Sequence, residues 1–401
     1  MMVSSLSNLH AKPAASAVGF GRGFVSPPPA SLPPTKVDTV LFGQTAKKPD
    51  FIVRTPAFPW LLDSAGYVKA GEVLKLIDIA GADPAFRHIG LNGKGAIVTA
   101  LVDRTDFREP IRRWDWINLE VRKTQVWNKS METQVNVYVE NARKGQPQRR
   151  HVATSHLVFV GIDPVTRKTV ALPEFTPKTK QEKELAHAAD IRKANREKEG
   201  KIAPFIPITD EDNPVVTSHD MTNDDANVLN NVFGGVILDV MSAGGCAAAK
   251  RHIIDGTPVG VRMDRMSFVA PTFVGETVET KAVVTKAWNT SMEVQIEVEA
   301  VHPDTGARRH VANAYMVFVK LMGEDRNGNP ELAQVPPWQP KTDAQKLRAE
   351  AAQTRREFRK QEQTEFEQSH LEAAIPKKPN VLARFLDWLV SWLERLKARI
   401  N

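Results

Sequence analysis

One carboxylate stands in a segment that otherwise reads as buried helix, and it is the first candidate for chemistry. Asp78 lies between Ile77 and Ile79 in the sequence LKLIDIAG. An ionised carboxylate is costly to bury unless it is paired, so an aspartate at this position needs a reason. One interpretation is a general base that activates water, or a nucleophile. The other is an aspartate that only hydrogen-bonds backbone groups in a decayed helix.

A second group of candidates precedes the most apolar helix-like segment. Asn227 closes the sequence DDAN, and Gly234 and Gly235 open the segment GGVILDVMSAGG. The asparagine amide is neutral and can orient a water or a carbonyl, or it can be a turn residue in a loop rich in Asp and Asn. The first backbone N–H groups of a helix favour developing negative charge, so the two glycines predict an oxyanion site. Close helix packing is the alternative role for Gly235.

Composition narrows the classes of protein. The 401 residues carry a formal net charge of +7 and a single cysteine, Cys246, which excludes a disulfide framework and a cysteine-built metal site. The uncharged stretch Val240–Ala249 is about half the length that a membrane-spanning helix needs. A pI near 9.3 fits an anionic partner. No aromatic-rich basic motif accompanies the charge, so nucleic acid is not the expected partner.

The chain contains an internal repeat. WNKSMETQV at Trp127–Val135 returns as WNTSMEVQI at Trp288–Ile296, and RRHVATSHLVFV at Arg149–Val160 returns as RRHVANAYMVFV at Arg308–Val319. The order is the same and the offset is nearly constant. A period of this length is far too long for a solenoid and indicates two fused copies of one domain.

Each copy predicts one strand, one helix and an antiparallel meander. The second helix is apolar nearly all round and rich in small residues, which is typical of a buried helix that a sheet approaches closely. A curved antiparallel sheet around a buried helix is the hot-dog arrangement, so the predicted fold class is α+β with two fused hot-dog domains. The predicted elements are Phe51–Thr55 and Val215–His219 as opening strands, Ala70–His88 and Gly234–His252 as central helices, and Glu276–Trp288, Ser291–Val301 and Arg309–Leu321 as meander strands.

The rest of the chain divides around these copies. We predict a disordered segment over residues 1–50, which are acid-poor and contain SPPPASLPP; a transit peptide is the alternative. The first domain with a trailing solvated helix covers 51–200, and the second with its trailing helix covers 201–370. Residues 380–401 predict an amphipathic helix that docks on a membrane surface, on a partner or on the chain itself.

The motif DDAN, followed by NVFGG and a Gly- and Ala-rich helix, resembles the acyl-CoA thioester hydrolases of the hot-dog superfamily. It is most similar to the cytosolic long-chain type with two fused hot-dog domains. The resemblance covers about residues 51–350. It implies hydrolysis of fatty acyl-CoA thioesters without metal or nucleotide cofactor, a cytoplasmic location, and assembly as a trimer of double-domain chains.

In that family the catalytic pair is split between the two domains. The resemblance assigns the asparagine role to Asn227 and the helix aspartate, seven residues after the second glycine position, to Asp78. The mirror arrangement has Asp63 at the asparagine position and Ser242 at the aspartate position, so it is expected to be inactive. One feature of the first copy departs from the family, since Pro84 lies inside the predicted helix and predicts a kink.

The resemblance also suggests groups that contact coenzyme A. Ser130 and Ser291, in the turns NKSME and NTSME, are candidates for the pantetheine or the phosphates, and serines that only start strands are the alternative. Arg104 and Arg265 are further candidates for the phosphates. Two other functions stay open: a non-catalytic protein that binds acyl-CoA or an acyl carrier, and a dehydratase or hydratase. The latter class usually carries a histidine on or before the central helix, and neither helix interior has one.

Overall fold

The predicted elements occur twice, in the same order, in the computed structural model. The structure describes residues 49–90, 95–141, 149–199, 205–227, 229–326 and 329–374. The described residues belong to one compact unit. The predicted disordered segment up to residue 48 and the predicted helix over 380–400 lie outside the described residues.

The first copy consists of β1 (Phe51–Pro56), α1 (Ala70–Ile89), β2 (Ala96–Val102), β3 (Thr105–Asp106), β4 (Asp115–Val126), β5 (Ser130–Asn141), β6 (Arg150–Ile162) and α2 (Lys180–Glu199). The second copy consists of β7 (Val215–Asp220), α3 (Gly234–Ile253), β8 (Thr257–Met263), β9 (Met266–Ser267), β10 (Thr277–Ala287), β11 (Ser291–Val301), β12 (Arg308–Glu324), β13 (Pro330–Ala333) and α4 (Asp343–Ala374). Short 3-10 helices stand at Pro59–Leu61, Asp210–Asp212 and Asn223–Asp225. The prediction of two fused hot-dog domains is therefore confirmed.

Each copy contributes an edge strand to the other copy's sheet. The first sheet has the order β1-β4-β5-β6-β2-β9, and the second has the order β3-β8-β12-β11-β10-β7, with β13 paired to β12. The pairs are antiparallel; Leu101 of β2 pairs with Ser267 of β9, and Thr105 of β3 pairs with Met263 of β8. Through these exchanged strands, one edge of each sheet is hydrogen-bonded to a strand of the other copy. The two copies therefore share sheet edges as well as a core.

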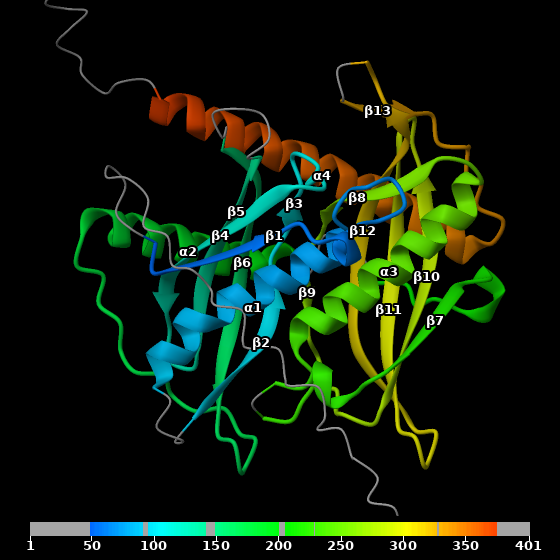
Figure 1. The fold of residues 1–401 in the computed structure, drawn as a ribbon. Coiled ribbons are helices and arrows are strands. Elements are labelled where there is room, and N and C mark those ends of the chain that lie inside the picture. The colour runs from blue at the N-terminus through cyan, green and yellow to red at the C-terminus, as the bar shows by residue number, and fades with distance from the viewer. Residues whose placement is uncertain are drawn as a thin grey trace, which may run out of the picture. The chain divides into compact units, whose positions relative to one another are not determined.

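The two central helices lie side by side against the sheets (Figure 1). They approach closely because each carries a glycine at the contact. A Cβ atom on Gly235 would lie 3.0 Å from both the Cα and the carbonyl oxygen of Lys75, and one on Gly71 would lie 2.9 Å from the Cα of Asp239. One apolar core cluster runs through both copies and includes Leu74 and Met241 of the two helices.

Pro84 does not interrupt α1. The helix runs for 20 residues, the same length as α3 in the second copy, and Pro84 is buried inside it. The helix therefore continues through the proline without a break. Asp78 lies six residues before Pro84, within the continuous helix.

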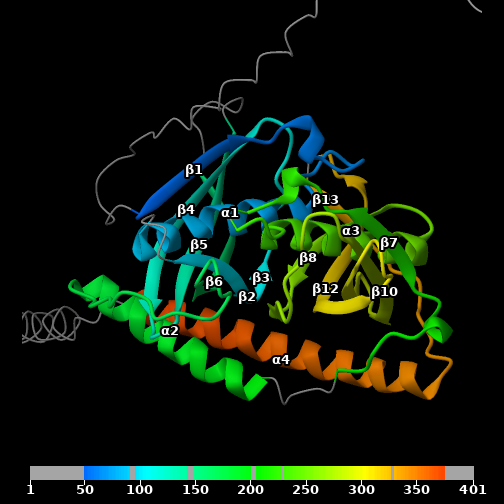
Figure 2. The same cartoon turned by 90° about the horizontal axis from the view of Figure 1, so that it is seen from below.

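The trailing helices α2 and α4 lie on the side of the sheets opposite to α1 and α3 (Figure 2). Their outward faces are solvated as predicted, but each helix also sends two arginines inward to carboxylates of a sheet, which the charge pattern did not predict. On α4 the side chains of Arg348 and Arg359 are almost fully buried. The pairs are Arg192 with Glu132, Arg196 with Asp103 and Glu132, Arg355 with Glu293, and Arg359 with Asp264 and Glu293.

Among the helices that the structure describes, none has the length and apolar character needed to cross a membrane.

Candidate active site

The carboxylate of Asp78 joins three elements from both copies. It projects from α1 and is fully buried. The Thr99 hydroxyl on β2 donates a hydrogen bond of 2.8 Å to Oδ1, and the Gly235 backbone N–H at the start of α3 donates one of 2.6 Å to Oδ2. The aspartate is thus held at the positive end of a helix that belongs to the other copy. The sequence argument that an aspartate in this helix requires a partner is borne out by this geometry.

Burial and hydrogen bonding act on Asp78 in opposite directions. Desolvation raises the pKa of its carboxyl, and the hydrogen bonds from Thr99 and Gly235 lower it, with a net result of about 6. A carboxyl with this pKa is ionised at neutral pH and is still a stronger base than an exposed aspartate. These are the properties that a general base needs.

Asn227 is fixed by a turn of its own loop. Its side-chain Oδ1 accepts hydrogen bonds from the backbone N–H groups of Leu229, at 2.8 Å, and Asn231, at 3.2 Å. The turn interpretation is therefore correct for the oxygen, and the Nδ2 amide is the end of the side chain that remains to bind a ligand. No hydrogen bond joins Asn227 to Asp78 within the described residues. The loop that carries Asn227 leads through Phe233 directly into Gly234 at the start of α3.

The two glycines that open α3 have different surroundings. The Gly235 N–H donates to the Asp78 carboxylate and is therefore not open to an oxyanion, and the missing side chain of Gly235 permits the close approach of Lys75. Gly234 leaves space: a Cβ there would lie 3.1 Å from Asp78 Oδ2 and 3.2 Å from the Cβ of Thr99. The Gly234 N–H, at the first helical position beside the carboxylate, remains the candidate oxyanion donor.

The mirror site keeps the turn of this arrangement and differs in its side chains. Asp63 Oδ1 accepts the N–H groups of Ala65 and Tyr67 at 2.9 and 3.0 Å, the same turn as at Asn227. Ser242 is buried at the position that corresponds to Asp78. Gly260 corresponds to Thr99, because Thr99 pairs with Phe159 and Gly260 pairs with Phe318. Ala70 stands where the composite site has Gly234. The mirror site thus differs at the base, its hydroxyl partner, the amide and the glycine.

The two candidate serines each begin a strand. Ser130 is the first residue of β5 and Ser291 is the first residue of β11. Their carbonyl oxygens accept the N–H groups of Trp127 and Trp288, at 2.7 Å in both cases, and so close the turns. Their contact with coenzyme A stays a prediction.

The two candidate arginines engage carboxylates of the opposite copy. Arg265 lies 2.7 Å from Asp103, and Arg104 lies 3.7 Å from Asp264. The charges of Arg265 and Arg196 outweigh burial and hold the pKa of Asp103 at about 2. These pairs give the two arginines a structural role between the copies, and their contact with phosphate stays a prediction.

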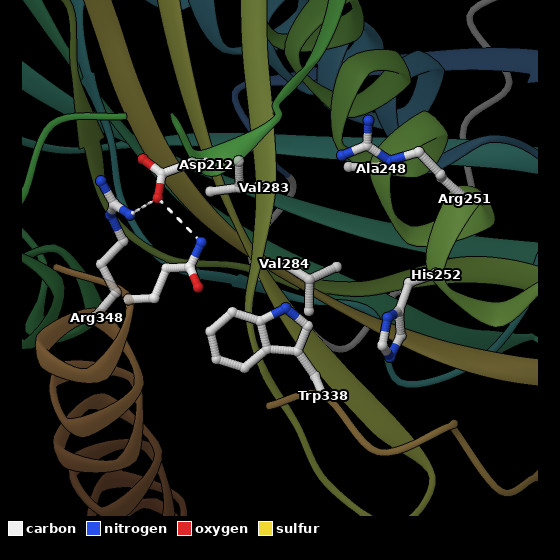
Figure 3. A pocket seen from close by; sticks show the side chains of 9 residues that line it. Asp212, Ala248, Arg251, His252, Val283, Val284, Trp338 and Arg348 are labelled. Carbon is white, nitrogen blue, oxygen red and sulfur yellow. Dashed lines mark hydrogen bonds and ion pairs between the residues drawn. The ribbon is translucent and has the colours of Figure 1, made fainter. Parts of the chain in front are cut away.

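The remaining polar groups at the helix ends serve the fold. The ring Nε2 atoms of His88 and His252 lie 2.8 Å from the carbonyl oxygens of Pro173 and Pro336. A cavity of about 180 Å³ lies at the carboxyl end of α3, and Asp212 in its lining accepts a hydrogen bond of 2.6 Å from Arg348. Figure 3 shows the side chains that line this cavity. Across the described part of the chain, no three His, Cys, Asp or Glu side chains are grouped to hold a metal ion.

Thr99 is the site residue that sequence reasoning missed. It stands in the strand sequence AIVTALV, where a single threonine is unremarkable. A signal existed in the repeat, because the corresponding strand TPVGVRM carries glycine at that position. The signal could not be read without knowing that β2 passes beside the helix of its own copy and the helix start of the other.

The chain is similar to known proteins over both of its copies. The model of the family described as "Thioesterase superfamily" matches residues 65–146 and 229–307. The chain is 28% identical over 304 residues to the human "Cytosolic acyl coenzyme A thioester hydrolase", covering 73% of this chain and 78% of that protein. It is 33% identical over 151 residues to the Bacillus subtilis "Uncharacterized acyl-CoA thioester hydrolase YkhA", covering 37% of this chain and 83% of that protein. The rat "Acetyl-coenzyme A thioesterase" is 26% identical over 276 residues, and the match covers 64% of this chain and 48%, about half, of the relative.

Proposed function

This chain belongs to the thioesterase superfamily, and from that premise we propose that it hydrolyses fatty acyl-CoA to free coenzyme A and a carboxylic acid. The observation that carries the proposal is the buried Asp78 carboxylate, held by Thr99 and by Gly235 of the other copy. A buried carboxylate that two hydrogen-bond donors hold in place, with a pKa of about 6, suits the removal of a proton from water at neutral pH.

The chemistry assigns one role to each group. Asp78 takes a proton from a water whose oxygen attacks the thioester carbonyl carbon. The Gly234 N–H and the amino end of α3 face the oxyanion that develops on the carbonyl oxygen. The carbon–sulfur bond then breaks, and Asp78 returns its proton to the departing sulfur. Coenzyme A leaves as the free thiol. Asn227 orients the water or the thioester through its Nδ2 amide.

Two alternatives make different demands on the residues. A dehydratase or hydratase would use a histidine at the central helix, whereas His88 and His252 stand at the helix ends and face backbone carbonyls. A non-catalytic acyl-CoA binding protein would not need the base and its two donors. Neither alternative explains why the buried Asp78 carboxylate accepts hydrogen bonds from both Thr99 and Gly235.

Two further parts of the proposal concern the location in the cell and the assembly. The human relative is named as cytosolic, and a cytoplasmic location is part of the proposal. Assembly as a trimer of double-domain chains is the second part, and sedimentation equilibrium of the purified chain tests it.

An acyl-CoA panel tests the activity directly. The full chain is assayed with straight-chain acyl-CoA thioesters from two to eighteen carbons, with release of free thiol as the readout. We expect turnover that depends on chain length. Absence of thiol release across the whole panel, with the protein folded by circular dichroism, would contradict the proposed hydrolysis and favour the binding protein.

A further inference from the structure

The mirror site contains a cavity of about 670 Å³, which is within the size range of small-molecule sites. Ala70 and Gly260 line it, which are the mirror counterparts of Gly234 and Thr99, while Asp78, Thr99 and Asn227 do not line it. The cavity is therefore assigned to the mirror site through Ala70 and Gly260, while Asp63 and Ser242 do not line it. Much of the lining is apolar and comes from both copies. The apolar side chains are Val68, Val73, Phe107, Ile111, Val152, Val259, Val261, Val319, Leu321, Pro330 and Leu332, with Ala70 and Pro110.

Arginines surround the same cavity. Its lining contains Arg108, Arg112, Arg113 and Arg150 against the carboxylates Glu109 and Asp115. Arg150 pairs with both of these carboxylates, and Arg112 lies 3.0 Å from Glu324 on β12. Even with Glu324 counted, positive charge exceeds negative charge around the cavity. Arg108 and Arg113 are exposed, so the positive charge beside the cavity reaches the solvent.

The loop that carries these arginines has an apolar counterpart in the second copy. Both loops have the same backbone contacts: Phe107 N–H donates to Val261, and Phe268 N–H donates to Ala100, at 2.9 and 3.0 Å. The side chains differ, since Val269, Phe273 and Val274 stand where the first copy has Arg108, Arg112 and Arg113. The loop conformation therefore does not require arginine, and the three positive charges are a feature of the mirror site alone.

We propose that the mirror site binds an acyl chain with an anionic head and does not hydrolyse it. The apolar walls receive the chain, and the arginines at the rim attract and pair with the head group. The aspartate of the composite site has no counterpart in the mirror site, because Ser242 replaces it and Gly260 replaces the threonine that would hold it. The carboxylates that line the cavity, Glu109 and Asp115, are both paired with Arg150. This function goes beyond the proposed hydrolysis, since it concerns a second ligand in the same chain. An acyl-CoA and a free fatty acid both have the required chemistry.

Calorimetric titration of the full chain distinguishes these sources. The probes are S-hexadecyl-coenzyme A, a thioether that cannot be hydrolysed, palmitate, and coenzyme A without a chain. The test variant is Arg108→Val with Arg113→Val, which installs the residues of the second copy at two exposed positions. The matched control is Arg87→Val with Arg308→Val, which removes the same charge from positions that do not line the cavity.

We expect the thioether or palmitate, but not coenzyme A alone, to bind at the mirror site, with affinity at least tenfold lower in the test variant than in wild type or control. The probe that shows this difference identifies the head group. Turnover of palmitoyl-CoA at saturation should be the same in all three proteins. Superimposable titrations of test variant and control with both chain-bearing probes would overturn the proposal. Because binding is measured without turnover, this result is independent of whether the chain hydrolyses thioesters.

Discussion

At the scale of single residues, Asp78 shows the balance that a base in an apolar helix requires. Its pKa of about 6 lies above the ordinary value of 3.8, so the folded chain holds this proton more tightly than the unfolded chain does. The stability that accompanies the protonated form is fully present below about pH 4 and is lost as pH rises through about 6. At 1.36 kcal/mol per unit, ionising Asp78 costs the folded state about 3 kcal/mol at neutral pH. The site thus gives up stability for basicity.

Removing the Thr99 hydroxyl should raise the pKa of Asp78, so that activity appears only at higher pH. The hydroxyl donates to the ionised form, so Thr99→Val raises the pKa of Asp78 further and moves the acid limb of the kcat/KM profile upward. A hydrogen bond to a charged group is worth about 1.5–3 kcal/mol, so activity at pH 6 should fall by roughly tenfold or more. The pH dependence of thioester turnover is the measurement.

Thr133→Val is the matched control for this variant. Thr133 is buried, and its hydroxyl donates to the backbone carbonyl of Gly81 on the same helix, not to Asp78. The acid limb of the kcat/KM profile of Thr133→Val should coincide with that of wild type. An unchanged limb in Thr99→Val would show that Thr99 does not tune the base.

Residues differ in how well sequence alone identified them. That Asp78 is paired was predictable, because a charge between two isoleucines is costly without a partner. The role of Asn227 was assigned by the family resemblance and stays a prediction. Thr99 and the true role of Gly235 were not predictable, since both depend on which atoms two separate copies bring together. Hydrogen bonds between distant segments leave no periodic trace in a sequence.

At the scale of elements, hydrophobic patterning located the helices and strands closely. The central helices were predicted to end at His88 and His252 and they end one residue later. The trailing helices were harder, because a mixed run of Lys, Glu and Arg looks the same whether one face is solvated or paired. In α4, Arg359 bonds Asp264 at 2.9 Å and also contacts the fully buried Glu293.

Breaking this buried pair should loosen α4 from its sheet. Burial opposes ionisation of Asp264, and the charge of Arg359 outweighs it, so the pKa of Asp264 lies below its usual value. Arg359→Met leaves two carboxylates without that partner and should lower the free energy of unfolding by about 3–5 kcal/mol. Lys346→Met, which removes an exposed pair with Asp343 on the same helix, should cost less than about 1 kcal/mol. Denaturant unfolding compares the two, and equal small losses would show that the arginine contacts do not hold the helix.

At the scale of the whole molecule, duplication has produced one complete site and one altered site. Sequence comparison of the copies predicted that asymmetry from two positions, Asp63 and Ser242. Ala70, in place of the first glycine of the pair, is a further difference visible in the sequence. The structure adds Gly260, which occupies in the second copy the strand position that Thr99 occupies in the first. It also places the large arginine-rimmed cavity at the altered site, which the sequence did not predict because the loops only meet the opposite sheet in the folded chain.

The most direct test of the account compares kcat for thioester hydrolysis in Asp78→Asn with kcat in Ser242→Ala and Asp63→Asn. Asp78→Asn keeps the shape of the side chain and removes the base, so kcat should fall by about 10²–10⁴-fold, the usual contribution of a positioned acid or base. The two mirror-site variants should retain the kcat of wild type. Wild-type kcat in Asp78→Asn, with turnover by the wild-type chain established, would contradict the assignment of catalysis to the composite site.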